Sequence, residues 1–428
     1  MKTKAFGLWS AVFLGIGSMV GAGIFIVIGQ AGAIAGNLVT LSFLLAAIIA
    51  LLCGYSLSKL AITYPSRGGI IEYLTQTYGE GYISGSLGIL FYLAQLIALA
   101  AVAKSFGTYG ATYMDGGVTP FYTNLFATAV LAAFVIVNLI GAAVVARAES
   151  LIVIIKLIAL LIFTAGALYY IKPENLSLSH APSGVHVLFS LGLTFFAFQG
   201  FSVITNSVED MKDPQSTMLR SMILSIVLVA ILYISVSVAV FGNLSLAQII
   251  QSKDFALAQA AEPIFGSLGF KLIAATALLA TASAINATLY AVTQISYTLA
   301  KEGNLPEVYE HHIFHNSEGL VISALLTLPL ILFLDLSEIA AIASIVVLLI
   351  QGFTHTGHLF HIKETGANRA LILLAIVGTF SAAGFAIYYT SQSIPHFELY
   401  VVVAFLAAFL LEVALRNITQ RTIKRQIK

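Results

Sequence analysis

The chain has 428 residues and a formal net charge of +1; 59% of the residues are hydrophobic and only 9% are charged. This composition excludes an ordinary soluble domain, in which about 25% of residues are charged. The balanced charge gives no indication of a nucleic-acid partner, because proteins that bind nucleic acids carry basic patches. We therefore predict a polytopic membrane protein whose surroundings are the lipid bilayer.

Twelve stretches, taken in chain order, are long and apolar enough to cross roughly 30 Å of hydrocarbon as helices. They are residues 8–34, 38–60, 83–110, 122–146, 150–170, 186–207, 219–242, 268–300, 319–334, 337–360, 369–390 and 397–416. None alternates apolar and polar residues as the strands of a membrane barrel do. We predict an all-α polytopic membrane protein with twelve transmembrane helices in one domain at 1–416, followed by a basic tail at 417–428.

The basic residues between these stretches indicate how the chain is oriented. If both termini are cytoplasmic, the cytoplasmic side receives fifteen Lys and Arg residues and the outside receives three, with Lys104 and Lys156 inside spans. Cytoplasmic loops of membrane proteins carry such an excess. We predict a multi-pass protein of a prokaryotic plasma (inner) membrane with both termini in the cytoplasm.

The first apolar stretch contains the segment GIGSMVGAGIF, residues 15–25, with glycines at 15, 17, 21 and 23. Each glycine costs a helix roughly 1 kcal/mol relative to alanine. Glycines in membrane helices also allow close packing of helices, so this cluster alone does not separate packing from a broken helix. A break at this depth is tolerated only where the backbone is buried in protein or lines a water-filled cavity.

A second weak helix lies five spans later, at residues 195–206. Gly200 is in the middle of this span and has polar neighbours at Gln199, Ser202, Thr205 and Asn206. Breaks in the first and sixth spans occupy corresponding positions in two five-span halves. This pattern is typical of secondary transporters built from inverted repeats, which bind their substrate near the membrane midplane. Together the two clusters favour broken helices over simple packing.

Four motifs resemble the amino acid–polyamine–organocation (APC) transporters. The segment at 15–25 resembles the first-helix motif of that family, and YPSRGGIIEY at 64–73 resembles its loop between helices two and three. The segments FFAFQGFSVITNSVEDMKDP at 195–214 and NATLYAVTQISYTLAKEGNLP at 286–306 are similar to its sixth and eighth helices with their following loops. Within the family, the lysine of ESLIVIIKLIALL at 149–161 is typical of the proton-coupled, ApcT-like branch.

The resemblance covers residues 6–416 and implies a LeuT-type 5+5 inverted repeat with broken helices 1 and 6 and two extra helices. Repeat one would span about 6–170, repeat two about 186–360, and helices 11 and 12 about 369–416. Ser202 stands where many relatives have an acidic residue linked to gating or to cationic substrates. This departure weakens any assignment of a cationic substrate. A second departure, in the loop at 215–220, has no interpretation here.

The resemblance also implies how an α-amino acid would bind. Backbone N–H groups of Gly21, Ala22 and Gly23 would hold the carboxylate, because a freed helix start attracts anions. Small residues are expected there so that the substrate can approach the backbone. The ammonium group would contact three backbone carbonyls, those of Met19, Phe196 and Gln199.

The side-chain pocket would be lined by residues of the sixth and third helices, namely Phe198, Phe201, Ser202 and Gln95. These residues include no ionisable group, and a buried unpaired substrate charge would be costly. We therefore predict neutral L-amino acids as substrates.

Lys156 is an ionisable residue inside the fifth span, and such residues mark functional sites by default. It lies about six residues, roughly 9 Å, from the cytoplasmic end of its span, so its ammonium group could instead extend to the membrane surface. In ApcT-like proteins this lysine places its ammonium group where sodium-coupled relatives bind a cation. The resemblance therefore implies contacts with the Gly17 carbonyl and Ser283, with Thr281 nearby. Protons would be the coupling ion, with no other cofactor.

Several polar residues outside this site have simpler interpretations. Three histidines at 355, 358 and 361 share a helical face, and three at 311, 312 and 315 lie in a loop. Both groups are at span ends, where solvated polar residues are normal, so we predict no metal site. Lys104 lies towards the outer end of its span and is expected to extend to the interface.

Two loops are candidate gates. Residues 247–261, between the seventh and eighth spans, look amphipathic, and in the family this external loop packs over the vestibule as part of a gate. Residues 209–213, with the sequence EDMKD, are predicted to be a solvated cytoplasmic loop or, alternatively, part of an inner gate.

Four functions remain as alternatives at this point. We predict proton-coupled import of neutral L-amino acids by a secondary active transporter with alternating access. An amino-acid exchanger without net proton coupling is the main alternative. An intramembrane enzyme would need clustered His, Asp or Glu residues facing one cavity, and the spans contain almost none. A channel is disfavoured because symmetric breaks favour alternating access over a continuous pore. The oligomeric state stays open.

Overall fold

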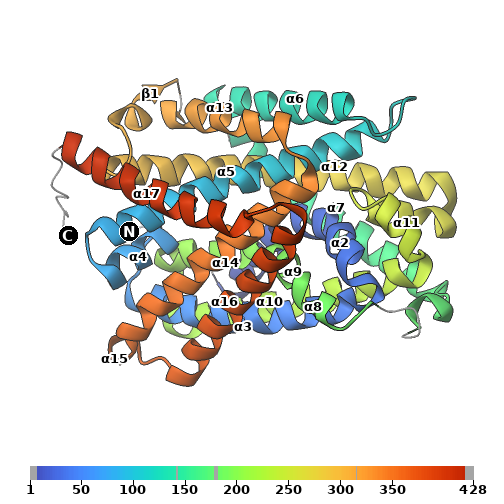
Figure 1. Cartoon of the computed structure of the whole chain (residues 1–428), viewed down its shortest axis with the longest axis horizontal. Helices are drawn as coiled ribbons and strands as arrows, with labels where there is room; N and C mark the ends of the chain where they lie inside the picture. Colours follow the sequence, from blue (N-terminus) through green and yellow to red (C-terminus); the bar gives the residue numbers. More distant parts are fainter. Residues whose placement is uncertain (1–6, 141–142, 178–181, 315, 420–428) are drawn as a thin grey trace.

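The computed structural model describes residues 7–140, 143–177, 182–314 and 316–419. Within these ranges the chain is a bundle of helices, and a single short antiparallel pair, β1 (His312–Ile313) with β2 (Asn316–Ser317), lies at one edge (Figure 1). The all-helical prediction is confirmed. Most of the predicted basic tail, residues 420–428, lies outside the described residues.

The helices of the first half, in chain order, are α1 (Leu8–Met19), α2 (Ala22–Ala35), η1 (Gly36–Leu38), α3 (Val39–Thr63), α4 (Ile70–Tyr78), α5 (Tyr82–Ala111), α6 (Pro120–Ile140), α7 (Ala143–Tyr169) and η2 (Pro173–Leu176). The second half contains α8 (Val185–Phe189), α9 (Leu191–Ala197), η4 (Gln199–Asp210), α10 (Pro214–Asn243), α11 (Leu246–Gln251), α12 (Ala256–Lys301), η5 (Glu307–Glu310), α13 (Glu318–Phe333), α14 (Leu336–Phe360), α15 (Ile362–Thr365), α16 (Arg369–Ser393) and α17 (Phe397–Thr419).

The described residues include ten helices that are long and apolar enough to cross a membrane, and two shorter apolar helices, α1 and α13. This confirms a multi-pass membrane protein, while the count of twelve spans and the five-plus-five repeat stay predictions. The predicted eighth span, 268–300, is the main part of α12, which kinks at Gly266. Gly266 has φ of +66°, a conformation that favours glycine.

Local sequence signals explain where several helices begin. Asp335 and Glu338 form a capping box at the start of α14, in which the Asp335 carboxylate accepts a hydrogen bond from the Glu338 N–H at 2.8 Å. Asp213 caps α10 in a similar way, and Pro214 follows as the first helical residue. These caps satisfy N–H groups that have no partner inside the helix.

The outer helices present large apolar side chains to their surroundings. Phe121 on α6, Ile162 on α7 and Leu410 on α17 are each more than half exposed. Continuous apolar exposure of this kind is abnormal for a protein surrounded by water. We infer that these helices face lipid.

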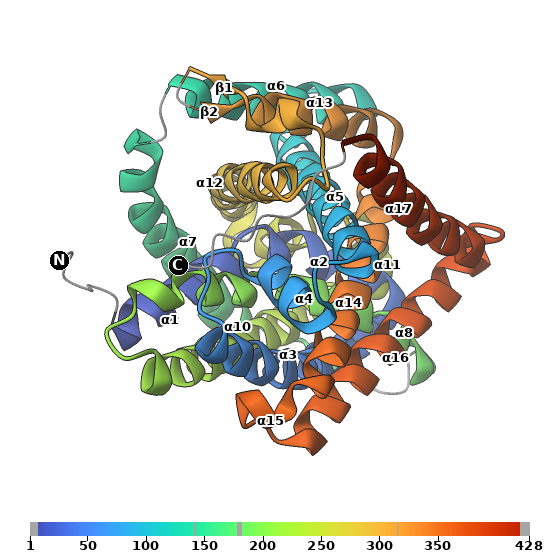
Figure 2. The ribbon, with the colours of Figure 1, turned by 90° about the vertical axis from the view of Figure 1, so that its left-hand side faces the viewer.

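The two spans with glycine clusters are packed against other helices at their breaks, while the first part of α1 exposes Trp9 and Phe13. Helix α1 packs on α10 and η4, and α2 packs on α9 and α12. Figure 2 shows α2 near the middle of the bundle, with α6 and α13 side by side at one edge and α16 and α17 at another. The segments that carry the candidate site are therefore enclosed by other helices.

Candidate functional site

The first span is broken where its glycines cluster. Helix α1 ends at Met19 and α2 begins at Ala22, while Gly21 has φ of −112° and ψ of −119°, outside helical values. The sixth span changes form at a corresponding place, because α9 ends at Ala197 and the chain continues from Gln199 as the 3-10 helix η4. The two breaks expected from the glycine pattern are thus present in the backbone.

The two breaks touch through their backbones. A Cβ atom on Gly200 would lie 2.5 Å from the Ser18 carbonyl carbon and 2.6 Å from the Met19 nitrogen. A Cβ atom on Gly23 would lie 2.6 Å from the Ala197 oxygen. Real Cβ atoms do not approach backbone so closely, so both glycines are needed for contact between the spans.

This contact gives Gly23 a packing role. The space beside its Cα is filled by the backbone at Ala197 in this conformation. Gly21 is less crowded, because its added Cβ would meet the Ala284 Cβ at an ordinary 3.4 Å. The side chain of Ala22 lies outside the described part of the structure.

Tyr233 on α10 joins the two breaks, and the sequence interpretation missed it. Its hydroxyl lies 2.7 Å from the Met19 carbonyl, to which it donates a hydrogen bond, and 3.2 Å from the Ala197 carbonyl. The side chain is fully buried. A tyrosine in the middle of an otherwise aliphatic span is the signal that could have identified it, since a buried phenol requires a polar partner.

The three carbonyls expected to bind an ammonium group already have partners. Met19 O accepts from Tyr233 and from the Gly21 N–H, Phe196 O accepts from the Phe198 N–H, and Gln199 O accepts from the Ser202 hydroxyl at 3.3 Å. By contrast, Gln199 Oε1 is buried and has no hydrogen-bond partner among the described residues. This side-chain oxygen is an acceptor that remains available at the break.

Two of the predicted pocket side chains pack against aromatic neighbours. Phe198 lies against Tyr233 with ring centroids 5.1 Å apart and the rings tilted, and Phe201 lies edge-on to Phe195 at 6.3 Å. Phe196 is also buried, while Gln95 on α5 and Ser202 are half-buried. Phe198 and Phe201 therefore pack into the core in this conformation.

Lys156 on α7 contacts the end of α1 directly before the first break. Its Nζ donates a hydrogen bond to the Gly17 carbonyl at 2.8 Å, and its side chain is only 1% exposed. This burial rules out the alternative in which the ammonium group extends to the membrane surface. The link ties α7 to the last turn of α1, directly before the break.

The other expected partners of Lys156 bond elsewhere. The Ser283 hydroxyl on α12 donates to Glu149 Oε1, on the same helix as Lys156, at 2.5 Å. Thr281 donates to the Ala277 carbonyl of its own helix at 2.7 Å. The cluster therefore contains Glu149, which the sequence interpretation overlooked although it is a carboxylate near a span.

A polar network closes one end of the bundle beside α2. Gln30 Nε2 donates to Asp254 Oδ1 at 2.5 Å, and Gln30 Oε1 accepts from the Ser337 hydroxyl at 2.7 Å. Lys253 Nζ donates to the same Ser337 hydroxyl at 2.7 Å. These four residues, Gln30, Lys253, Asp254 and Ser337, join α2, the α11–α12 loop and α14. Lys253 and Asp254 belong to the segment predicted as an external gate.

Lys104 does not extend to the interface as expected. It is 8% exposed, and its Nζ donates to Asn124 Oδ1 and to the Ile331 carbonyl, both at 2.6 Å. The buried ammonium group is satisfied inside the protein because two oxygens from neighbouring helices are within reach.

We expect Asp254→Asn to change how stability depends on pH. Burial, opposed by Gln30 and Lys253, raises the pKa of Asp254, so the carboxyl binds protons more tightly in the folded protein. The wild type should then lose stability as pH rises from the unfolded pKa through the higher folded value. Because Asn does not titrate, the melting temperature of the variant relative to wild type should rise as the pH increases above about 4, the ordinary pKa of an aspartate. A difference that is constant over this range would contradict the expectation.

At the other end of the bundle, Arg67 bridges two loops. Its guanidinium lies 2.8 Å from Asp210 and 3.5 Å from Glu209. These pairs are exposed, so they add little stability. The neighbouring Gly69 has φ of +56°, and an added Cβ would lie 2.4 Å from Asn206 Oδ1. The YPSRGG loop therefore packs directly on the sixth span. Glu209 and Asp210 are exposed, as the prediction of a solvated segment expects, and they also pair with Arg67 of this loop.

Two of the histidines expected to be solvated are buried. His355 and His358 on α14 each place Nδ1 2.8 Å from the Ser56 hydroxyl on α3, and His358 Nε2 lies 2.8 Å from the Thr365 hydroxyl. These bonds cross-link α3, α14 and α15. The second group includes residue 315, which lies outside the described residues. The described residues contain no cluster suited to a metal ion.

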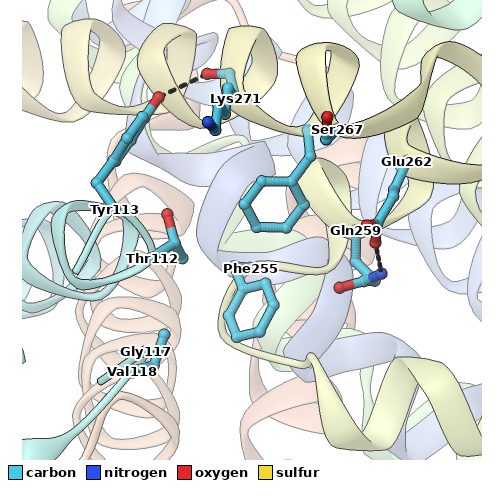
Figure 3. A pocket seen from close by; sticks show the side chains of 10 residues that line it. Thr112, Tyr113, Gly117, Val118, Phe255, Gln259, Glu262, Ser267 and Lys271 are labelled. Carbon is cyan, nitrogen blue, oxygen red and sulfur yellow. Dashed lines mark hydrogen bonds between the residues drawn. The ribbon is translucent and has the colours of Figure 1, made fainter. Parts of the chain in front are cut away.

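Two clefts lie away from the breaks. One, of about 320 Å³, lies between the end of α5 and the first part of α12 (Figure 3). It is lined by Tyr113, Phe255, Glu262, Lys271 and neighbouring residues, and the Tyr113 hydroxyl donates to the Lys271 carbonyl. The other is apolar and lies beside Ile140 and Phe314. Neither contains a predicted site residue.

Taken together, these features define a polytopic helical membrane protein with two broken spans in backbone contact at its centre. Comparison with known sequences gives the family. The model of the amino acid permease family matches residues 6–414, and the chain belongs to that family. The APC resemblance is confirmed, and its members are permeases, which is consistent with a protein that is not an enzyme.

Three relatives illustrate the range of the family. The inner membrane transport protein YbaT of Escherichia coli is 34% identical over 343 residues, covering 80% of each chain. The branched-chain amino acid permease BcaP of Bacillus subtilis is 26% identical over 320 residues, 71% of this chain and 68% of the relative. The serine/threonine exchanger SteT of Bacillus subtilis is 26% identical over 406 residues, 89% of this chain and 90% of the relative. These similarities support amino acids as the transported class.

Proposed function

We propose that this protein is a secondary active transporter that imports neutral L-amino acids together with protons by alternating access. It would act in a plasma membrane with both termini in the cytoplasm, and it would need no cofactor besides the coupling proton. The hydrogen bond between Lys156 and the Gly17 carbonyl carries the proposal. It places an ionisable group where its charge can hold or release the broken first span.

The proposed cycle follows from the strength of this bond. A charged ammonium group donates a stronger hydrogen bond than a neutral amine does. With Lys156 protonated, α7 and α1 are held together; after proton release the link weakens and α1 can move relative to α7. Substrate entry and proton binding are coupled because both act on the same broken segment.

The substrate would bind beside the two breaks. Its carboxylate would accept from backbone N–H groups at Gly21, Ala22 and Gly23, at the start of α2. Its ammonium group would contact Gln199 Oε1, which is buried and has no partner among the described residues. Phe196 and Gln95 would border the side chain. Ser202, in place of an acid, supports neutral substrates, and so does the similarity to BcaP, which is a branched-chain amino acid permease.

An exchanger without net proton movement is the second candidate. SteT is a serine/threonine exchanger, and the similarity to SteT extends over most of this chain. An exchanger would swap amino acids at equal rates with or without a pH gradient.

The deciding experiment is uptake by purified protein in liposomes. Labelled alanine, serine, leucine and phenylalanine should accumulate when the outside is acidic, without a requirement for sodium. Excess lysine or arginine should inhibit this uptake poorly, because a second substrate charge would be buried without a partner. Strong inhibition by arginine would contradict the neutral assignment. Uptake that is unchanged by the gradient but accelerated by amino acid inside the vesicles would support the exchanger.

A further inference from the structure

Glu149 is a carboxylate that the proposed mechanism does not use. It lies on α7 seven positions before Lys156, so the two residues share one face of the helix. Their Cα positions are separated by roughly 10 Å along the helix axis. Glu149 is partly buried, and its charge is close enough to attract the Lys156 ammonium group.

Ser283 on α12 is in direct contact with Glu149. Its hydroxyl proton is already directed at Glu149 Oε1, at 2.5 Å. A serine oxygen has two lone pairs and can accept a hydrogen bond while it donates one. Ser283 is 4% exposed and Lys156 is 1% exposed, so bulk water has little access to either side chain.

From this arrangement we propose that Glu149 takes the proton of Lys156 through Ser283 and then passes it to the side of the membrane where α7 begins. This inference rests on the proposed proton coupling and adds the exit group for the proton. By the distribution of Lys and Arg residues, that side is predicted to be the cytoplasm.

The transfer balances in protons and charge. One N–H bond of the Lys156 ammonium group breaks and its proton binds Ser283 Oγ, while the original Ser283 proton moves to Glu149 Oε1. The products are a neutral amine, an unchanged serine and a neutral carboxylic acid. Replacing two opposite charges by two neutral groups is favourable away from water. The carboxylic acid then releases its proton to cytoplasmic water, which resets Glu149.

In this structure each end of the relay is held by another partner. The ammonium group is held by Gly17, and the hydroxyl is held by Glu149. In the proposed transfer, the ammonium group gives its proton to the free lone pair of Ser283, and the neutral amine that remains holds Gly17 more weakly. Proton release thereby permits movement of α1.

The test compares net uptake with exchange in proteoliposomes that contain the full-length protein. Glu149→Gln keeps an acceptor oxygen for Ser283 but cannot take a proton. Net uptake of labelled alanine, serine, leucine or phenylalanine driven by a pH gradient should fall roughly 100-fold, the scale of a lost proton-transfer group. Exchange against the same amino acid inside the vesicles should remain near the wild-type rate, because exchange does not require the proton to leave.

Two further variants keep the result decisive. Ser283→Ala should show the same split between net uptake and exchange, and it serves if Glu149→Gln does not fold. Glu398→Gln, an exposed carboxylate on α17, should behave as wild type. Equal losses of net uptake and exchange in Glu149→Gln would overturn the relay and indicate a structural role. Net uptake at the wild-type rate in both Glu149→Gln and Ser283→Ala would also overturn the relay.

Failure of the relay can be separated from failure of proton coupling. If wild-type uptake ignores the pH gradient, the proposed function fails and the relay fails with it. If wild-type uptake follows the gradient, requires Lys156 and survives Glu149→Gln, only the relay fails. The dependence of net uptake on external pH is a second readout, and it should flatten in Glu149→Gln.

Discussion

Lys156→Ala is expected to abolish uptake driven by a pH gradient while substrate binding stays largely intact. The substitution removes the only hydrogen bond described between α7 and the Gly17 carbonyl in the part of the chain covered by the structure. Without an amine there is no group whose protonation can tighten or release the broken span. Uptake in proteoliposomes and equilibrium binding of labelled amino acids, measured on the same preparation, check both halves of the expectation.

Lys104→Ala is the matched control for this variant. Lys104 is also a buried lysine inside a span, but its ammonium group binds Asn124 and the Ile331 carbonyl away from the breaks. Its removal should lower the melting temperature and leave the dependence of uptake on pH in place.

Sodium should not restore uptake by Lys156→Ala, and it should not stimulate uptake by the wild type. Full gradient-driven uptake by Lys156→Ala would refute the coupling role.

Gly200→Ala is expected to cause the largest loss through packing alone. The new Cβ would lie 2.5 Å from the Ser18 carbonyl carbon and 2.6 Å from the Met19 nitrogen, and neither backbone atom can rotate away. The two broken spans must separate, which overpacks their surroundings at a cost of about 1–3 kcal/mol. The melting temperature in detergent should fall. Uptake should drop to near background, because the binding groups on the two spans no longer lie at the correct distance from each other.

Gly384→Ala provides the control for adding a methyl group to a helix. An added Cβ at Gly384, on α16, has nothing within 4 Å. Alanine favours the helix by up to about 1 kcal/mol over glycine, so this variant should be as stable as wild type or slightly more stable. If Gly200→Ala matched it in melting temperature and uptake, the backbone contact between the breaks would not be required.

The sequence predicts the spans well because crossing a membrane imposes a strong and simple pattern. Stretches such as 83–110 and 337–360 correspond closely to α5 (Tyr82–Ala111) and α14 (Leu336–Phe360). Their ends are marked by charged or turn-forming residues, which can be recognised from the sequence alone. The breaks at 20–21 and 198 can also be predicted from the sequence, because glycine and polar residues are unusual inside an apolar stretch.

The contacts around the breaks are less accessible to such reasoning. Tyr233 and Glu149 were missed because their partners, Met19 and Ser283, are more than a hundred residues away in the chain. His355 and Lys104 were misplaced for a related reason. Position near the end of a span suggests solvation, yet Ser56 and Asn124 from other helices give these groups buried partners.

By itself, the sequence determined that this is an all-helical membrane protein of the amino acid permease family, where its spans lie and which two are weak. These properties depend on hydropathy and on backbone freedom, which each segment carries without its neighbours. Only the tertiary structure decided that Gly200 and Gly23 serve backbone contact, that Lys156 reaches Gly17, and that Ser283 turns to Glu149. Those outcomes depend on which helices pack together, because a buried polar group takes whichever partner the packing brings within hydrogen-bond distance.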